Sequence, residues 1–194
     1  MTDPFVFPRE YHFPPFFTRQ TNITTHHAQL TKWSALILSF CRHHRIFKLS
    51  LSSFNPSQQP PSNSAPSSEN APPTETLFYN PKINRRLSVA DIKEVIAFMR
   101  KQGTAEPVGD DGDVVWIYWR RPEEWAASVE KWVEETAQRG MVLTVYELTE
   151  GETCRGSDFY GLDRELMVKA LQVLVKKGKA QIFGQEDSLG VKFF

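Results

Sequence analysis

Two stretches of the chain share a pattern in which a helix ends at a glycine and a strand begins: Met99-Arg-Lys-Gln-Gly103-Thr-Ala-Glu-Pro-Val108 and Leu174-Val-Lys-Lys-Gly178-Lys-Ala-Gln-Ile-Phe183. They lie 75 residues apart. Basic residues followed by a glycine are typical of a helix C-terminus. A polar turn and a strand that contains aromatic residues follow each stretch, which predicts a β-hairpin. We therefore expect two copies of one structural unit.

Apolar residues at helical spacing surround these two stretches. Residues 26–45, 88–103, 122–140 and 163–178 each carry an apolar stripe of the kind that one helix face buries. A short strand is expected at residues 141–145. The expected order of each copy is helix, strand, helix, helix and hairpin, which is the order of a winged helix. The predicted fold class is α+β, with two tandem winged-helix domains preceded by an extended N-terminal arm.

Changes in composition set the predicted domain boundaries. The extended arm is assigned to residues 1–24, the first winged helix to residues 25–121 and the second to residues 122–194. Six of the thirteen prolines and five serines lie between residues 55 and 75. We expect a disordered insertion there, at about residues 53–76 of the first domain, because such a segment has too few apolar side chains to offset its ordering entropy. Long surface insertions destabilise a domain little, because loop-closure entropy grows slowly with length.

The N-terminal arm is rich in aromatic residues and proline between residues 5 and 17, where the chain reads Phe-Val-Phe-Pro-Arg-Glu-Tyr-His-Phe-Pro-Pro-Phe-Phe. Prolines at three positions exclude a regular helix. The rings fold back onto the chain's own first unit or dock on another polypeptide, and we expect docking. Two phenylalanines in pockets would supply roughly 3–6 kcal/mol before docking costs. The expected partner-binding residues are Tyr11, Phe13, Pro14, Pro15, Phe16 and Phe17.

The charge distribution argues against nucleic-acid binding. Formal net charge is zero, and the turn of the first hairpin carries Asp110, Asp111 and Asp113 where a DNA-binding wing would approach phosphate. A nucleic-acid-binding winged helix is the alternative function, and it rests on analogy of fold alone. No apolar run approaches the roughly 20 residues of a membrane-spanning helix. We expect neither a nucleic-acid partner nor direct membrane insertion.

Metal-site and enzyme signatures are missing from the sequence. Cys41, His43 and His44 suggest a metal site, but adjacent histidines on a helix point about 100° apart. Cys41 also falls on an apolar stripe, so we interpret it as a core cysteine. Two cysteines without short spacing predict neither a disulfide scaffold nor a zinc finger. Because no catalytic motif is present either, we expect a protein without cofactor or metal that is not an enzyme.

The junction between the predicted domains is dense in large side chains, with the run Trp119-Arg-Arg-Pro-Glu-Glu-Trp125. The two arginines and two glutamates form either an ion-pair joint between the domains or an ordinary helix start. In the second case the acids favour the N-terminal dipole of the helix. The residues alone leave both interpretations open.

Several segments resemble the small subunit of the ESCRT-II endosomal complex. They are residues 11–18 (Tyr-His-Phe-Pro-Pro-Phe-Phe-Thr), 38–42 (Leu-Ser-Phe-Cys-Arg), 119–125, 146–151 (Tyr-Glu-Leu-Thr-Glu-Gly), 161–163 (Gly-Leu-Asp) and 190–194 (Gly-Val-Lys-Phe-Phe). The resemblance spans nearly the whole chain, and its chief departure is the long connection at residues 55–75.

This resemblance implies a non-enzymatic adaptor with two tandem winged helices. In the family, two copies of the small subunit join one copy each of two larger winged-helix subunits. The resemblance assigns that docking to Pro14, Pro15, Phe16 and Phe17, and assigns recruitment of the initiating ESCRT-III subunit to the second winged helix. It implies a cytoplasmic protein that is recruited to the endosome membrane, where ubiquitinated cargo is sorted into multivesicular bodies. Copies of the free chain are expected to self-associate if the rings of Phe16 and Phe17 stay uncovered.

Overall fold

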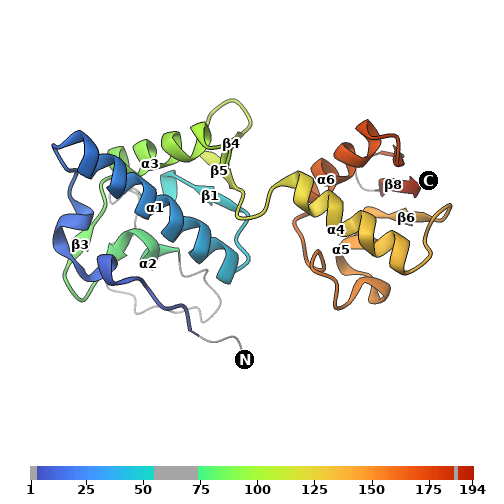
Figure 1. Ribbon diagram of the computed structural model, residues 1–194, viewed down its shortest axis with the longest axis horizontal. Coiled ribbons are helices and arrows are strands. Elements are labelled where there is room, and N and C mark those ends of the chain that lie inside the picture. Colours follow the sequence, from blue (N-terminus) through green and yellow to red (C-terminus); the bar gives the residue numbers. More distant parts are fainter. Residues whose placement is uncertain (1–3, 55–73, 186–187) are drawn as a thin grey trace. The chain divides into compact units, whose positions relative to one another are not determined.

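The computed structural model describes residues 4–54, 74–185 and 188–194, and the chain divides into two compact units, residues 1–119 and 120–194 (Figure 1). Most of the predicted insertion, residues 55–73, lies outside the described residues. Its described flanks are folded, because Phe54 is buried in a 3-10 turn and a helical turn begins at Glu75. The two ends of the expected range 53–76 therefore belong to the domain.

The first unit is built on a three-stranded antiparallel sheet in the order β1-β5-β4. After the N-terminal segment its elements are α1 (Ile23–His43), β1 (Lys48–Ser50), η3 (Ser52–Phe54), α2 (Glu75–Phe78), β2 (Tyr79–Asn80), β3 (Arg85–Arg86), α3 (Val89–Lys101), β4 (Ala105–Val108) and β5 (Val114–Ile117). The central strand β5 pairs with both neighbours, with Val115 opposite Leu49 on one side and Pro107 on the other. Helix α1 packs beside α3.

The second unit repeats this arrangement. Its elements are α4 (Pro122–Glu135), β6 (Val142–Thr144), α5 (Val145–Glu150), η4 (Glu152–Cys154), α6 (Arg164–Lys176), β7 (Ala180–Phe183) and β8 (Gly190–Phe193), with the sheet order β6-β8-β7. In both units the last strand is central, the first strand lies at one edge and the hairpin partner at the other. The α+β class is confirmed. The second unit has the order helix, strand, helix, helix and hairpin, and the first unit has the same order with the β2–β3 hairpin added between its second and third helices.

The two glycines of the repeat end their helices in the same way. Gly103 and Gly178 have φ of 71° and 70°, in the left-handed region that glycine enters without strain. The following amide of Thr104 donates to the carbonyl oxygen of Met99 at 3.0 Å, and Lys179 repeats this contact with Leu174 at 2.9 Å. The shared helix–glycine–strand pattern therefore reflects one turn geometry that is used twice.

Side-chain caps begin two of the predicted helices. The Ser88 hydroxyl accepts from the Asp91 amide at 3.1 Å, and the Asp163 carboxylate accepts from the amides of Glu165 and Leu166 at 2.9 and 3.3 Å. These contacts satisfy amide groups that the first turn of a helix leaves without an intrahelical acceptor. Helix α1 begins three residues before the expected position, because Asn22 caps it by accepting from the Thr25 amide at 3.1 Å.

The prediction of an extended arm is wrong. The N-terminal segment forms two 3-10 turns, η1 (Arg9–His12) and η2 (Pro14–Phe17), and it lies along α1 beside the β2–β3 hairpin (Figure 1). The prolines exclude an α-helix, but a 3-10 turn does not need their missing N–H groups at its start. The amides of Phe16 and Thr18 close the second turn by donating to Phe13 and Pro15.

One of the three acids in the first hairpin turn has a structural role. The Asp113 carboxylate accepts from the Ser52 amide at 2.8 Å and from the hydroxyls of Ser50 and Ser52 at 2.9 Å. These hydrogen bonds, chiefly those from Ser52, hold the pKa of Asp113 below its usual value. Asp113 therefore ties β1 to the start of β5, while Asp110 and Asp111 stay exposed.

The two arginines at the start of the second unit contact residues of that same unit. The Arg120 guanidinium lies 4.5 Å from the Trp125 ring centroid and pairs with Asp158 at 3.1 Å. The Arg121 amide donates to the Glu124 carboxylate at 2.7 Å, at the start of α4. These contacts agree with the helix-start interpretation.

Candidate protein-docking site

The candidate site is the N-terminal segment, residues 5–18, which α1 and the β2–β3 hairpin hold in place. Of its six predicted partner-binding residues, three are buried in the first unit and three are exposed. Tyr11, Phe16 and Phe17 are 3%, 6% and 4% exposed, whereas Phe13 is 60% exposed and Pro14 and Pro15 are also exposed. The motif therefore has an inner face that belongs to the core and an outer face that is open to a partner.

Tyr11 anchors the segment to the hairpin. Its hydroxyl proton is shared between the carbonyl oxygens of Thr76 and Tyr79, and its own carbonyl accepts from the buried Asn80 amide group at 2.7 Å. Phe7 stacks on the Tyr11 ring with centroids 3.9 Å apart. Burial disfavours the phenolate form and raises the pKa of Tyr11 to about 12. Tyr11 is therefore held within the first unit, and its contact with a partner stays a prediction.

Phe16 and Phe17 enclose Trp33 on the apolar face of α1. The Phe16 ring is stacked on the Trp33 indole with centroids 4.3 Å apart, and Phe17 meets the same ring edge-on at 5.3 Å. The indole N–H donates to the Phe16 carbonyl at 3.0 Å. Trp33 thus gains both an apolar cover and an acceptor for its N–H group, which a buried tryptophan requires.

Both rings are buried against α1 in this structure, and their docking on a partner stays a prediction. Burying two phenylalanines contributes roughly 3–6 kcal/mol, which stabilises the first unit itself. It also removes the reason for expecting self-association, since neither ring is uncovered. The sequence shows that the motif is apolar and rich in proline, but it does not show which polypeptide covers the rings.

Gln29 is a site residue that the sequence interpretation missed. This buried side chain donates to the carbonyls of Phe16 and Thr18 at 2.8 and 2.9 Å and accepts from the Gln20 amide at 3.3 Å. It therefore fixes the backbone on the C-terminal side of the two prolines. The available signal was its position four residues before Trp33, which places a polar group on an apolar helix face.

The outer face combines an apolar edge with a cation. Pro14, Pro15, Thr18, Gln20 and Arg85 line a shallow hollow of about 250 Å³. The Arg85 side chain is exposed on the hairpin strand that lies beside η2. The backbone under this hollow is held by the Gln20 side-chain amide, which donates to the Pro15 carbonyl at 2.9 Å and to Thr18 at 2.8 Å. The hollow is therefore a preformed feature of the first unit.

A second, more apolar groove of about 400 Å³ runs between the segment and α1. Phe5, Phe7 and Phe16 line it together with Ala35 and Leu36 of the helix. The Lys32 ammonium pairs with the Glu10 carboxylate at 2.7 Å across its rim, and this contact lowers the pKa of Glu10. Phe5 packs edge-on against Phe40, with centroids 5.1 Å apart.

The second unit exposes apolar side chains at its edge strand. Met141, Val142 and Tyr146 are 55%, 54% and 65% exposed at the junction of β6 and α5. The adjacent Thr144 and Glu147 cap α5 reciprocally, because each accepts from the other's amide, at 2.6 and 3.1 Å. Hydrogen bonding from Thr144 lowers the pKa of Glu147. The exposed side chains are therefore carried by a well-defined helix start.

The described residues contain no group of three or more histidine, cysteine or acidic side chains with metal-binding geometry. Cys41 is fully buried, as the core-cysteine interpretation predicts, and burial raises the pKa of its thiol to about 12. Across residues 4–54, 74–185 and 188–194, the helices are too short or too polar for a membrane crossing.

Comparisons with known proteins give one consistent result. A family model described as "ESCRT-II complex subunit" matches residues 10–163. Vacuolar protein-sorting-associated protein 25 of Mus musculus is 39% identical over 190 residues, which cover 98% of each protein. The protein of the same name from Xenopus laevis is 36% identical over 98% of this chain and 99% of its own length.

Two solved structures are similar over almost the full chain. One is the crystal structure of subunit VPS25 of the endosomal trafficking complex ESCRT-II, with a TM-score of 0.78. The other is the endosomal complex ESCRT-II (VPS22/VPS25/VPS36), with a TM-score of 0.76. Both are 25% identical in sequence and cover 96% of this chain and 98% of the matched chain.

Proposed function

This chain belongs to the family of ESCRT-II complex subunits, and we propose that it is a non-enzymatic scaffold subunit that joins two larger subunits in an endosomal trafficking complex. The observation that carries the proposal is the similarity over 98% of the chain to proteins of one name, together with a preformed hollow at Pro14 and Pro15 and the exposed ring of Phe13. One solved relative is assembled with VPS22 and VPS36, which identifies the class of partner. The order of elements in both units supports their classification as winged helices.

We propose that the larger subunits bind the outer face of the N-terminal segment. Phe13, Pro14 and Pro15 present apolar surface on a backbone that is already held in one conformation, so little entropy is lost on binding. Arg85 adds a positive charge beside the hollow, which a carboxylate of the partner would complement. In this proposal Tyr11, Phe16 and Phe17 support the face from below.

The test is a titration of the two larger ESCRT-II subunits with the full chain carrying Phe13→Ala, Pro14→Ala or Arg85→Ala. Each change should weaken binding at least fivefold, since a central interface residue typically contributes more than 1 kcal/mol. Ile23→Ala is the matched control, because Ile23 is 87% exposed and lies outside the hollow. Thermal melts show whether each variant is folded. Wild-type affinity in all three folded variants would refute docking at this face.

We propose further that the second unit recruits the initiating ESCRT-III subunit while the complex is bound at the endosome. The exposed side chains of Met141, Val142 and Tyr146 support this role, because exposed apolar surface marks protein-binding sites. Full chains carrying Tyr146→Ser should lose ESCRT-III binding and keep the larger ESCRT-II subunits, whereas Phe13→Ala should do the opposite. Loss of ESCRT-III binding in the Phe13→Ala chain alone would reverse the two assignments.

A further inference from the structure

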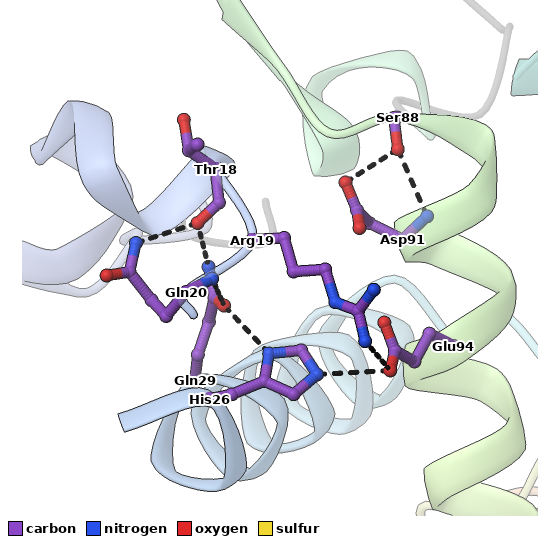
Figure 2. A network of polar contacts seen from close by, with 8 residues as sticks. All are labelled: Thr18, Arg19, Gln20, His26, Gln29, Ser88, Asp91 and Glu94. Atoms are coloured by element: carbon purple, nitrogen blue, oxygen red, sulfur yellow. Dashed lines mark hydrogen bonds and ion pairs between the residues drawn. The ribbon is translucent and has the colours of Figure 1, made fainter. Parts of the chain in front are cut away.

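A chain of polar contacts connects α3 to the docking segment through one histidine (Figure 2). The His26 ring lies between two residues, with Nε2 3.1 Å from the Glu94 carboxylate and Nδ1 3.4 Å from the Gln29 side-chain oxygen. Gln29 then contacts the carbonyls of Phe16 and Thr18 in the segment. Only 17% of the His26 side chain is exposed. The ring is therefore connected to the segment through a single intermediate side chain, Gln29.

The surroundings of Gln29 fix the orientation of its amide group. Its nitrogen faces two backbone carbonyls, which only accept hydrogen bonds, so that end must be the NH₂ group. Its other end faces the backbone amide of Gln20, which only donates. The atom next to His26 Nδ1 is therefore the Gln29 oxygen, which is an acceptor.

His26 consequently lies between two acceptors. The Glu94 carboxylate accepts at Nε2 and the Gln29 oxygen accepts at Nδ1. A neutral imidazole carries one N–H group and would place a lone pair against one of these oxygens. The imidazolium form carries two N–H groups and satisfies both contacts. The doubly protonated ring is the form that fits this site.

The charges around the ring favour the same form. Arg19, the residue that follows the segment, pairs with Glu94 at 3.1 Å, on the same carboxylate oxygen that His26 contacts. Asp91 of α3 borders the same small cavity, and its carboxylate accepts from the Ser88 hydroxyl at 2.6 Å. On its own helix, the neighbouring His27 ring packs against Phe98, with centroids 5.4 Å apart. With His26 protonated, this group of Arg19, His26, Asp91 and Glu94 is electrically neutral.

We propose that His26 is a positioning residue that locks the docking segment onto the first unit when its ring carries two protons. The proposal rests on the proposed docking function of the segment. With both ring protons in place the lock is closed. When the ring loses one of them at higher pH, one of its hydrogen bonds becomes a contact between two acceptors. The segment then loosens, and binding of the larger subunits weakens.

Nuclear magnetic resonance on the full chain tests the lock without any partner. We expect the ¹⁵N shifts of the His26 ring to show two N–H groups at about pH 6, the lower part of the range in which histidine titrates. The backbone amide of Gln20 donates to the Gln29 side chain, so the hydrogen exchange of this amide reports on the lock. Corrected for the intrinsic rate, its exchange should speed up about threefold to tenfold between about pH 6 and pH 8. That change corresponds to the loss of one charge-assisted hydrogen bond at a partly exposed site.

Two variants of His26 shift the lock in opposite directions. His26→Arg keeps a permanent cation, so Gln20 protection and partner affinity should match the wild type at about pH 6 and stay constant as the pH rises through the histidine range. His26→Gln should resemble the high-pH state throughout. His27→Gln is the matched control, because it removes an exposed neighbouring imidazole and should keep the pH dependence of the wild type.

A singly protonated His26 ring at about pH 6 would overturn the proposal. So would a Gln20 exchange rate with the same pH dependence in wild type and His26→Arg, because that pH dependence would then not come from the His26 ring. Partner affinity is measured separately with the larger ESCRT-II subunits. If the wild type binds them at no pH, the docking function fails, while the ring shifts and the Gln20 exchange still decide whether the lock exists.

Discussion

Replacing Phe16 by alanine should destabilise the first unit, although the residue belongs to a motif that resembles a docking signature. Phe16 is 6% exposed and its ring is stacked on Trp33. Truncation of a buried phenylalanine typically costs 3–5 kcal/mol, because transfer energy is lost and a cavity remains. The edge of the segment relaxes more easily than a central core, so we expect about 3 kcal/mol. Phe13→Ala is the matched comparison, since the same ring three residues earlier is 60% exposed and should contribute about 1 kcal/mol or less.

The free energy of unfolding of the Phe16→Ala and Phe13→Ala chains is measured by urea unfolding, followed by hydrogen exchange of α1 amides. These amides report on the segment because α1 lies under it. For a unit of this size a change of 3 kcal/mol shifts the urea midpoint by roughly 2 M. Equal destabilisation by Phe16→Ala and Phe13→Ala would refute the division of the motif into an inner and an outer face. A Phe16→Ala chain that loses partner binding is therefore evidence for docking through Phe16 only if the stability of the same chain is measured and found unchanged.

Tyr11→Phe should lower stability by about 1 kcal/mol, the net contribution of one hydrogen bond, and thermal unfolding checks it. Burial raises the pKa of Tyr11 to about 12, so its stabilising contribution is complete below the usual tyrosine value of 10.0 and is lost as the pH rises toward 12. The Tyr11→Phe chain should therefore lose less stability than the wild type between pH 10.0 and about 12. An equal loss of stability in both chains would contradict the burial of this hydroxyl. Gly178→Ala should lower the free energy of unfolding by about 1 kcal/mol. This loss comes from the left-handed backbone alone, since an added Cβ meets no atom within 4 Å. A melting temperature equal to that of the wild type would exclude this strain. Cys41 and Cys154 should not react with a thiol reagent until urea unfolds the chain, because both are buried and burial raises the pKa of both thiols; rapid labelling of the native protein would contradict that burial.

Local signals in the sequence predicted much of the fold. Gly103 and Gly178 and the caps at Ser88 and Asp163 act within one turn, so their geometry follows from neighbouring residues. The short elements were harder to predict. Strand β1 has three residues and the strands of the β2–β3 hairpin have two each, too few to show a period. Helix α5 did have a signal, because Thr144 and Glu147 are spaced as a capping box.

The candidate site was predicted only in part, for a physical reason. Composition showed that the rings of Phe16 and Phe17 must be buried, but burial against the same chain and burial against a partner have the same apolar signature. The deciding features are polar and distant in sequence. Trp33 needs an acceptor and Asn80 donates to Tyr11 from 69 residues away. The sequence gives no measure of which of these contacts forms.

The contacts between Tyr11 and the hairpin also set the order of events during synthesis. Tyr11 is joined to residues 65 to 69 positions further along the chain, so this part of the unit cannot close until residue 80 has been translated. At 5–20 residues per second that delay is roughly 3–14 s. Throughout it the hairpin contacts of Tyr11 are missing, and the rings of Phe16 and Phe17 have only α1 to pack against. The nascent chain, rather than the finished protein, is therefore the form most in need of a chaperone.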